Sequence, residues 1–370
     1  MKRVIVSVTN DLVTDQRVHK SCVLLQESGF EVTLVGRKLP GSLPLDRTYK
    51  THRFSLLFKA GAFFYAEYSI RLFLFLLIRR ADLFWSNDLD TLWPNYWISK
   101  LKNKPLIYDT HEYFTGVPEL ESRPKVQRVW KKIEKSIFPN LEHIITVNQS
   151  IANLYKKEYG KNLVVVRNIP PIFDVRTPSS RKNWGLPENE IVFILQGSGI
   201  NIDRGAEEAV AAIAETKSAH LVILGGGDVL PALNEIVDRL QLQHRVHFFP
   251  RMPYAKMMEC TGLADVGLTL DKDTNVNYRF SLPNKLFDYL QAGIAVIASG
   301  VVEVKNIVES YQVGRIIKSH NPSDIAQLMN EFIENEALLA ELKRNATEAA
   351  RSLHWDEEKR NLTQMIDRFV

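Results

Sequence analysis

A chain of 370 residues, of which 45% are hydrophobic and 24% charged, has a globular composition and is long enough for about two domains. Its formal net charge of +4 suits phosphorylated ligands or an anionic membrane face but is too small to argue for nucleic acid binding. The two cysteines lie far apart and no Cys/His cluster occurs, which argues against a disulfide framework and a metal site. The opening residues MKRVIVSVTN carry only a short apolar run, so we expect no signal peptide and a cytoplasmic protein.

The first part of the chain alternates short apolar runs with amphipathic stretches. We expect strands over 3–8, 31–35, 83–86, 106–108 and 143–147, and helices over 16–27, after 86 through 97, and 150–158. A long loop is expected after residue 108. This alternation predicts a doubly wound α/β fold with a parallel sheet, in which ligands bind at the carboxyl ends of the strands.

One segment, GAFFYAEYSIRLFLFLLI at residues 61–78, interrupts this rhythm. It has a borderline length for a membrane span, and two charges near its middle, Glu67 and Arg71, would cost several kcal/mol there. Arg79 and Arg80 follow it. We interpret residues 61–80 as an amphipathic helix that is partly core and could contact a membrane surface; the alternative is a helix packed wholly inside the domain.

A loosely patterned stretch over 167–190, with four prolines, is the expected linker between two domains over 1–168 and 169–352. A second alternation follows it. Strands are expected over 191–195, 220–224, 245–249, 265–270, 294–298 and 313–317, and helices over 204–215, 229–240, 254–261 and 283–293. From residue 322 onward only helices are expected, the last over 355–369.

Two loops of the second domain follow strands directly. In the first, Gly197 and Gly199 permit close backbone approach, and the Arg204 guanidinium can bind phosphate oxygens in a fork. In the second, Gly225 to Gly227 offer bare backbone beside a helix N-terminus. The alternative for both loops is a tight strand-to-helix turn without a ligand.

A third candidate is the short helix that begins at Pro283. Lys285 in its first turn opposes the helix dipole unless an anion binds there, and Asp288 could accept hydrogen bonds from sugar hydroxyls. The alternative is an ordinary solvated ion pair between these two residues. Taken together, the three segments describe a pocket for a nucleoside diphosphate.

Polar residues also follow three strands of the first domain, and we expect them to converge on one cleft. They are Asn10, Asp15 and Arg17, then Asn87, Asp88 and Asp90, and finally Asp109, His111 and Glu112. Carboxylates beside an imidazole can serve as a base, a metal site or hydrogen-bonding groups for a polyol. The alternative is a capping network that satisfies the backbone of these loops.

The order and spacing of these motifs resemble a known family. The stretches TDQRVHK, GFEVTLVG, IYDTHEYF, VVVRNIP, RGAEEAVAAI, LVILGGGD and SLPNKLFDYLQAGIAVIAS resemble those of the retaining GT-B glycosyltransferases of family 4, over about residues 1–300. The resemblance implies two Rossmann-like lobes facing across a cleft. It also implies that residues 353–370 cross back to complete the first lobe.

The resemblance implies roles for individual residues. Asp288 matches the second acid of the E-x7-E motif, which holds the ribose, and Arg204 matches the residue that neutralises the diphosphate. Lys285 belongs to a proline-x-lysine variant that supplies a second positive charge, and His111 matches a residue near the hydroxyls of the donor sugar. The other expected nucleotide-sugar ligands are Arg251, Met252, Leu282 and Pro283.

This sequence departs from the family pattern at two points. Phe280 stands at the first acid of the motif, with Ser281 and Pro283 in place of the usual glycines, which puts the donor sugar in doubt. Ser198 and Gly199 stand where a further arginine is usual. Neutralisation of the diphosphate charge would therefore depend on Arg204 and Lys285.

The resemblance implies a retaining hexosyl or related transferase that needs no metal or other cofactor. A nucleoside diphosphate sugar would be the donor, and a saccharide or lipid-linked acceptor would bind the first lobe during cell-envelope polysaccharide synthesis at the inner face of the membrane. One alternative is a GT-B epimerase that uses Asp109 and Glu112 as acid and base. Another is a non-catalytic sugar-nucleotide-binding subunit, which Phe280 makes conceivable.

Overall fold

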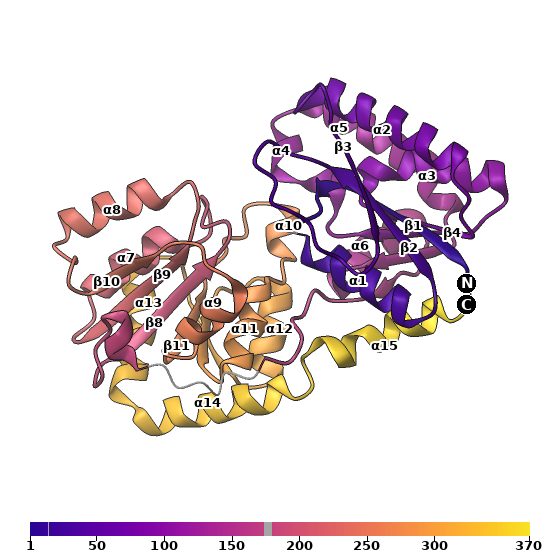
Figure 1. The fold of residues 1–370 in the computed structure, drawn as a ribbon. Helices are drawn as coiled ribbons and strands as arrows, with labels where there is room; N and C mark the ends of the chain where they lie inside the picture. The colour runs from indigo at the N-terminus through magenta and orange to yellow at the C-terminus, as the bar shows by residue number, and fades with distance from the viewer. Residues whose placement is uncertain (14, 174–179) are drawn as a thin grey trace. The chain divides into compact units, whose positions relative to one another are not determined.

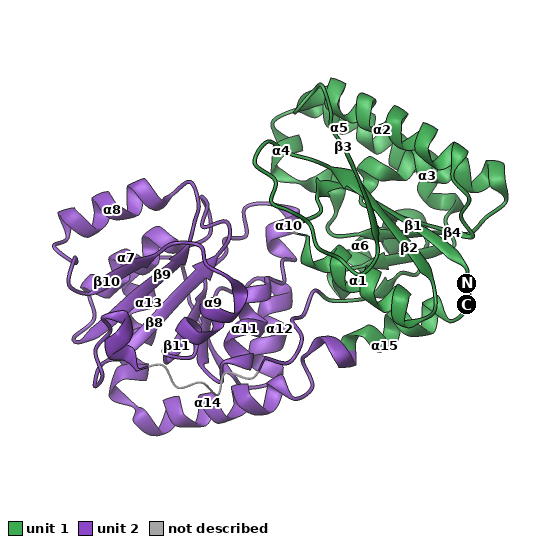
Figure 2. Ribbon diagram, viewed as in Figure 1, with its two compact units in different colours: residues 1–167, 358–370 green, residues 168–357 purple. Residues whose placement is uncertain are grey.

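The computed structural model describes residues 1–13, 15–173 and 180–370, and the chain folds into two compact units. Unit 1 comprises Met1–Arg167 and Glu358–Val370, and unit 2 comprises Asn168–Glu357 (Figure 2). The expected linker is described only in part, because residues 174–179 lie outside the described residues.

Unit 1 is built on a parallel sheet of seven strands in the order β3-β2-β1-β4-β5-β6-β7 (Figure 1). The strands are β1 (Arg3–Asp11), β2 (Glu31–Arg37), β3 (Lys50–Phe54), β4 (Leu83–Asn87), β5 (Leu106–Thr110), β6 (His143–Thr146) and β7 (Val164–Val165). The helices are α1 (Gln16–Glu27), α2 (Gly61–Ile78), α3 (Leu89–Lys102), α4 (Pro118–Glu121), α5 (Pro124–Ile137) and α6 (Gln149–Tyr159). The strand order reverses between β1 and β4, as in a doubly wound fold.

Unit 2 repeats this plan with six parallel strands in the order β10-β9-β8-β11-β12-β13. The strands are β8 (Ile191–Gly197), β9 (Ala219–Gly225), β10 (Val246–Phe249), β11 (Val266–Thr269), β12 (Ala295–Ala298) and β13 (Gly314–Ile316). The helices are α7 (Ala206–Ala214), α8 (Leu230–Arg239), α9 (Tyr254–Thr261), α10 (Val276–Arg279), α11 (Asn284–Gln291), α12 (Val302–Ser310), α13 (Pro322–Glu334) and α14 (Glu336–Ala350). The predicted α/β fold with two Rossmann-like domains is confirmed.

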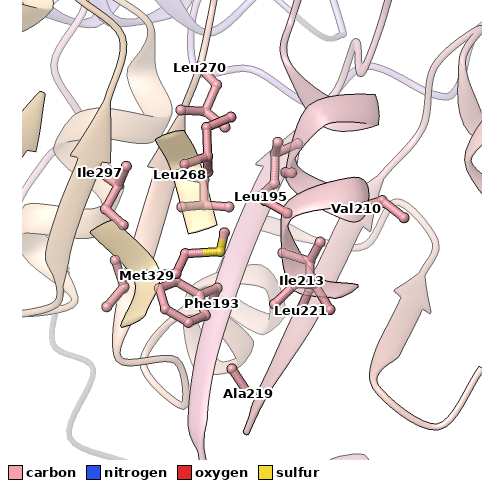
Figure 3. Packing of buried hydrophobic residues seen from close by; sticks show 14 of the residues in the cluster. Phe193, Leu195, Val210, Ile213, Ala219, Leu221, Leu268, Leu270, Ile297 and Met329 are labelled. Atoms are coloured by element: carbon pink, nitrogen blue, oxygen red, sulfur yellow. The ribbon is translucent and has the colours of Figure 1, made fainter. Parts of the chain in front are cut away.

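Apolar strands buried on both faces explain why the core is continuous through each sheet. In β8, Phe193 and Leu195 pack into one cluster of unit 2, whereas Val192 and Ile194 pack into the cluster on the other face. Figure 3 shows Phe193 beside Met329 of α13, with Ile213 of α7 on the same side of the sheet. Burying each such side chain contributes roughly 2 kcal/mol, so the strand interiors are mainly apolar, although β1 and β4 also bury Ser7 and Ser86.

The expected long loop after residue 108 is wrong, because this stretch contains α4 and α5. Helix α5 has apolar residues at helical spacing, and the sequence-based prediction overlooked this pattern: Val126, Val129, Trp130, Ile133 and Ile137. Strands β3 and β7 were not expected either. The sequence of β3, KTHRF, is mostly exposed at the edge of the sheet and lacks an apolar run.

Helix α2 buries a single stripe, formed by Phe64, Tyr68, Leu72 and Leu76. Its opposite face is apolar and exposed, with Phe63, Ile70, Leu74, Leu77 and Ile78. The interpretation as a helix packed wholly inside the domain is therefore wrong. By length and composition, α2 is the one helix in the described part of the chain that could cross a membrane.

The last helix, α15 (Trp355–Ile366), joins unit 1 from Glu358 onward. The buried Glu358 carboxylate accepts hydrogen bonds from Arg167 Nε and Nη2, at 3.0 and 2.7 Å, and from the Arg167 backbone N–H at 2.6 Å. Leu362, Met365 and Ile366 bury the same face of the helix. This bidentate pair therefore fixes the C-terminal helix to the end of the unit 1 chain.

Replacing Glu358 with alanine should lower the free energy of unfolding by about 3 kcal/mol, because the Arg167 guanidinium and its backbone N–H lose their acceptor. Chemical denaturation measures the change. Gln364→Ala, at an exposed position of the same helix, is the control and should stay within about 0.5 kcal/mol of the parent protein. A Glu358→Ala variant as stable as this control would contradict the structural role of the pair.

Candidate functional site

Two cations converge on one buried carboxylate at the carboxyl end of β11. The fully buried Asp271 accepts a hydrogen bond from Arg204 Nη1 at 2.9 Å, and Lys285 Nζ lies 3.9 Å from its other oxygen. The Arg204 guanidinium also lies over the ring of Tyr278, 4.3 Å from its centroid. One carboxylate beside two cations leaves a net positive charge, so the cluster favours an anionic ligand.

The backbone at Gly205 explains why Arg204 reaches Asp271. Gly205 has φ +74° and begins α7, and a Cβ at this position would lie 2.4 Å from Cβ of Leu270. Only glycine permits this conformation and this approach without strain. The loop therefore passes directly over the end of β11, which places Arg204 beside Asp271.

Hydrogen-bonding capacity remains unused in this cluster. Arg204 Nε and Asp271 Oδ2 are buried and have no hydrogen-bond partner among the described residues. Burial lowers the pKa of Lys285 and the Arg204 charge adds to this effect, whereas Asp271 opposes it. A bound anion would satisfy the donors and favour the charged form of Lys285.

Asp288 lies one turn further along α11 and is buried rather than solvated. Its carboxylate accepts hydrogen bonds from the Tyr254 hydroxyl at 2.8 Å and from Gln196 Nε2 at 3.2 Å. Thr261 in turn donates to Gln196 Oε1 at 2.6 Å. The alternative of a solvated Lys285–Asp288 ion pair is therefore wrong, since both side chains are largely buried and have these other neighbours.

The glycines of the two loops differ in whether the surrounding atoms leave room for a side chain. A Cβ at Gly225 or Gly227 would lie 1.9 Å from the carbonyl oxygen of Gly197 or Ile200, so packing between the loops demands glycine at both positions. A Cβ at Gly197 or Gly199 would meet nothing closer than 3.7 or 3.4 Å. Packing therefore requires glycine in the second loop, whereas in the first loop a Cβ would make only ordinary van der Waals contacts, and the predicted backbone contact with a ligand stays a prediction.

The remaining nucleotide-sugar candidates surround these loops. Arg251 is exposed and donates a hydrogen bond to the carbonyl oxygen of Ser198. Met252 and Leu282 are half-buried against the second core cluster of the unit, and Pro283 caps the start of α11. Phe280 directly follows the short helix α10. The ligand roles of these residues stay predictions.

In unit 1, the polar ends of β4 and β5 meet around His111. The buried Asp109 binds Arg17 in a fork, with distances of 2.7 and 3.2 Å. His111 Nδ1 lies 3.2 Å from one oxygen of Asp88, and the His111 backbone N–H donates to the other at 2.9 Å. His111 Nε2 lies 3.6 Å from Asp109 and has no hydrogen-bond partner within the described ranges.

These contacts set the protonation of the cluster. Burial lowers the pKa of His111, but the Asp88 and Asp109 carboxylates outweigh it and raise the pKa to about 9. Burial likewise raises the pKa of Asp109, but Arg17 and His111 outweigh it and the pKa falls below its ordinary value. Near neutral pH the imidazole is therefore a cation between two carboxylates, and it offers its Nε2 proton as a donor.

Asp88 adopts a backbone conformation that is almost confined to glycine, with φ 57° and ψ 167°. Such a conformation costs of the order of 1–3 kcal/mol and persists where the surroundings hold it. Here the Asp88 N–H donates to the Asp109 carbonyl oxygen at 2.9 Å, and its carboxylate binds His111. The strain therefore lies at the residue that orients the imidazole.

The other first-domain candidates have less direct positions. Asp15 caps α1 by accepting from the Val18 N–H, and Asn10 donates to its other oxygen at 3.0 Å. Glu112 is exposed. Asp90, by contrast, is buried and accepts from Thr9 at 2.5 Å, and burial raises its pKa to about 7. In the described part of the chain, no group of three or more His, Cys, Asp or Glu side chains is arranged to hold a metal ion.

Two similar solved structures share the fold of the whole chain. Sucrose-phosphate synthase from Thermosynechococcus elongatus is 17% identical, with a TM-score of 0.80 over 100% of this chain and 99% of that one. Anabaena HepE, in complex with UDP and glucose, is 14% identical, with a TM-score of 0.75 over 100% of both chains. At these identities the likeness shows the fold alone.

Family models match both units. The model for glycosyl transferases group 1 matches residues 177–352, and the model for glycosyltransferase family 4 matches residues 16–174. The chain belongs to the family 4-like GT-B glycosyltransferases. A similar curated relative is a chitobiosyldiphosphodolichol beta-mannosyltransferase from Candida albicans, 27% identical over 256 residues. That match covers 63% of this chain and only 54%, about half, of the relative.

Within this glycosyltransferase, the sequence did not identify Asp271, Gln196 or Tyr254 as site residues. Asp271 directly follows an apolar strand at its carboxyl end, and this position is the only sequence signal that could have selected it. Gln196 occupies an interior position of β8, and Tyr254 begins a helix remote from Asp288 in the sequence. Their contacts depend on the packing of β8, α9 and α11.

We expect the His111 pKa, measured by NMR titration, to lie near 9 and to fall toward 6.5 in Asp88→Asn. Asparagine has the size and shape of aspartate but removes one of the two charges that hold the proton. Because the folded pKa is raised, His111 contributes stability that is fully present below about pH 6.5 and is lost as the pH rises through about 9. His143, whose pKa burial lowers, is the internal control and should not change. An unchanged His111 pKa in the variant would refute the pairing with Asp88.

Proposed function

We propose that this protein transfers a sugar, with retention of anomeric configuration, from a nucleoside diphosphate sugar to a saccharide or lipid-linked acceptor. The observation that carries this proposal is the Arg204–Asp271–Lys285 cluster, whose net positive charge lies at the carboxyl ends of the unit 2 strands. Structural neighbours in complex with UDP or UDP-glucose support a nucleotide-sugar donor. In this proposal unit 2 binds the donor and unit 1 binds the acceptor.

The diphosphate is the leaving group, and its negative charge grows as the glycosidic bond breaks. Arg204 and Lys285 stabilise that charge, and they do so more strongly in the transition state than in the bound donor. Because Asp271 already orients the Arg204 guanidinium, little reorganisation is required when the charge develops. The proposed reaction proceeds by attack on the same face that the phosphate leaves, without a metal or other cofactor.

Two further groups suit sugar hydroxyl groups. We assign the Asp288 carboxylate, which Tyr254 and Gln196 hold in place, to the ribose hydroxyls. In unit 1, the His111 imidazolium offers its Nε2 proton to a sugar hydroxyl. Asp88 and Asp109 keep the imidazole protonated and oriented for this role.

The acceptor is assigned to the class that the curated relative's name describes, a saccharide linked through a diphosphate to a lipid. We place the reaction at the inner face of the cell membrane, in cell-envelope polysaccharide synthesis. The exposed apolar face of α2 supports this location.

The epimerase alternative is weakened by the ionic state of Asp109. An acid/base catalyst must exchange its proton near neutral pH, but Arg17 holds the Asp109 carboxyl ionised at a pKa below its ordinary range. Glu112, the other group of that alternative, has an exposed side chain, but burial of its carboxyl and the charge of Asp88 raise its pKa to about 7, so Asp109 alone weighs against the epimerase. The non-catalytic subunit remains an alternative that only an activity measurement separates.

Incubation with radiolabelled nucleoside diphosphate sugars and membrane-derived acceptors tests the proposal. We expect release of free nucleoside diphosphate together with label in the acceptor. Conversion of the sugar while it remains attached to the nucleotide would instead identify an epimerase. Binding of a donor without turnover against every acceptor would support the non-catalytic subunit.

Arg204→Ala and Lys285→Ala should each weaken nucleoside diphosphate binding by about 10- to 100-fold, because each removes a charge-assisted contact to phosphate. Titration calorimetry measures this with the diphosphate that best protects the protein against thermal unfolding. The control is Arg239→Ala, an exposed arginine at the opposite end of α8 from the strand ends. Unchanged affinity in both site variants would refute the assignment.

The exposed apolar face of α2 continues onto α3. Trp93, Trp97 and Leu101 form an exposed stripe on α3. Helices α2 and α3 lie side by side (Figure 1), and the rings of Phe73 and Trp93 lie 5.8 Å apart across them. Basic residues border this surface, namely Arg79 and Arg80 after α2 and Lys100 on α3. We propose that this surface, here called the α2–α3 face, rests on an anionic bilayer.

Ile70→Glu on the α2–α3 face should reduce sedimentation with vesicles of phosphatidylcholine and phosphatidylglycerol by about tenfold, because it buries a charge in the bilayer boundary. Val302→Glu, an exposed apolar residue of α12 in unit 2, is the matched control and should bind like the parent protein. We expect weaker binding to vesicles of phosphatidylcholine alone. Equal sedimentation of both variants would contradict this contact.

A further inference from the structure

A pocket of about 240 Å³ lies at the carboxyl ends of β2 and β3 in unit 1, beside the start of α2. It is distinct from the cluster around His111. Three cations, Arg37, Lys38 and Lys59, line it together with apolar side chains that include Leu56, Phe58 and Phe64. The nine residues that line it include no carboxylate, so the pocket is cationic.

Arg37 is held in place without using all its donors. Its guanidinium carbon lies 4.7 Å from the ring centroid of the buried Phe64, which fixes the side chain by a cation–π contact. Its Nε is buried and has no hydrogen-bond partner among the residues that the structure describes. A fixed guanidinium with an unused donor in a cationic pocket is suited to a phosphate oxygen.

The pocket adjoins the apolar surface of α2. The rings of Phe58, in the pocket wall, and Phe63, on the exposed face of the helix, lie 5.3 Å apart. Leu57, the neighbour of Phe58 in the chain, is 79% exposed. An apolar path therefore leads from the cationic pocket to the α2–α3 face.

The wall of the pocket is fixed by hydrogen bonds. Glu67 of α2 accepts from the backbone N–H groups of Leu57 and Phe58 at 2.9 and 3.0 Å, and its carboxylate also pairs with Arg71 at 2.7 Å. The only carboxylate of α2 is therefore engaged with the loop and with Arg71. Glu67 therefore does not neutralise the pocket cations Arg37, Lys38 and Lys59, whose charge can attract an anionic ligand.

We propose that this pocket binds the phosphate group of an amphiphile whose apolar tail lies along the exposed face of α2. Arg37, Lys38 and Lys59 contact the phosphate, and Phe58 and Phe63 contact the first part of the tail. The inference rests on the proposed function, because it assigns the phosphate end of a lipid-linked acceptor to this place. It adds a subsite that recognises the lipid carrier rather than the sugar.

Titration of the full chain with dodecyl phosphate, below its micellar concentration, tests the pocket. We expect saturable binding that weakens by about tenfold or more in Lys38→Ala/Lys59→Ala, since two charge-assisted contacts are lost. The matched control is Lys156→Ala/Lys157→Ala, two exposed lysines of α6 that do not line the pocket. Arg37→Gln should weaken binding as well, and if this variant fails to fold, the double lysine variant decides.

Two further probes separate the possible sources of the phosphate. Glycerol phosphate should bind much more weakly than dodecyl phosphate, and dodecyl maltoside should not compete with it. Equal affinity for glycerol phosphate would mean a soluble phosphate ligand and would overturn the lipid assignment. Equal affinity for dodecyl maltoside, or unchanged binding in the double lysine variant, would overturn recognition of phosphate.

These measurements use neither a sugar donor nor turnover, so the two proposals can fail separately. Dodecyl phosphate binding that depends on Lys38 and Lys59 supports the pocket even if no donor is ever turned over. Conversely, Lys38→Ala/Lys59→Ala could transfer sugar to a lipid-linked acceptor with an unchanged acceptor KM. That result would overturn the assignment of the pocket and leave the proposed transferase function standing.

Discussion

The parallel arrangement of every strand is the constraint on which both units depend. Strands buried on both faces are largely apolar, so most charged side chains lie at or beyond the strand ends; buried polar exceptions such as Ser7 in β1 and Gln196 in β8 have hydrogen-bond partners. All carboxyl ends lie at one edge of each sheet. Arg204, Asp271, Asp88 and Asp109 all lie at or near such ends, although they are widely separated in the sequence. The parallel arrangement therefore brings charged residues from distant parts of the sequence to one edge of each sheet.

The two clusters solve the problem of buried charge differently. A buried carboxylate without a partner would cost several kcal/mol, and in unit 2 two cations surround Asp271, which leaves a positive excess. In unit 1, Asp88 and Asp109 face Arg17 and the His111 imidazolium, so these four charges balance. The arrangement that stabilises unit 2 thus also attracts an anion, whereas the balanced cluster of unit 1 suits neutral hydroxyl groups.

The sequence predicted the features that depend on local pattern. Helix α1 was placed at its observed bounds, and the longer apolar strands were found, because strands buried on both faces have a mainly apolar sequence. The polar edge strand β3 lacks such a pattern and was missed. The two-residue strand β7 and helix α5 were also missed, although β7 lies in an apolar run and α5 has apolar residues at helical spacing. At the site, Arg204 and Lys285 could be selected from their loops. Asp271 and Tyr254 could not, because their contacts join segments far apart in the chain.

Folding does not account for the apolar outer face of α2. The fold requires only the buried stripe of this helix, and α5 shows that a helix of the same unit can present charged residues to solvent. An exposed apolar surface over two adjacent helices lowers solubility without stabilising unit 1, so its cause lies outside the chain. Phe58 and Phe63 connect that surface to the cationic pocket. A single ligand with a phosphate and an apolar tail would explain both features at once, whereas a soluble saccharide would explain neither.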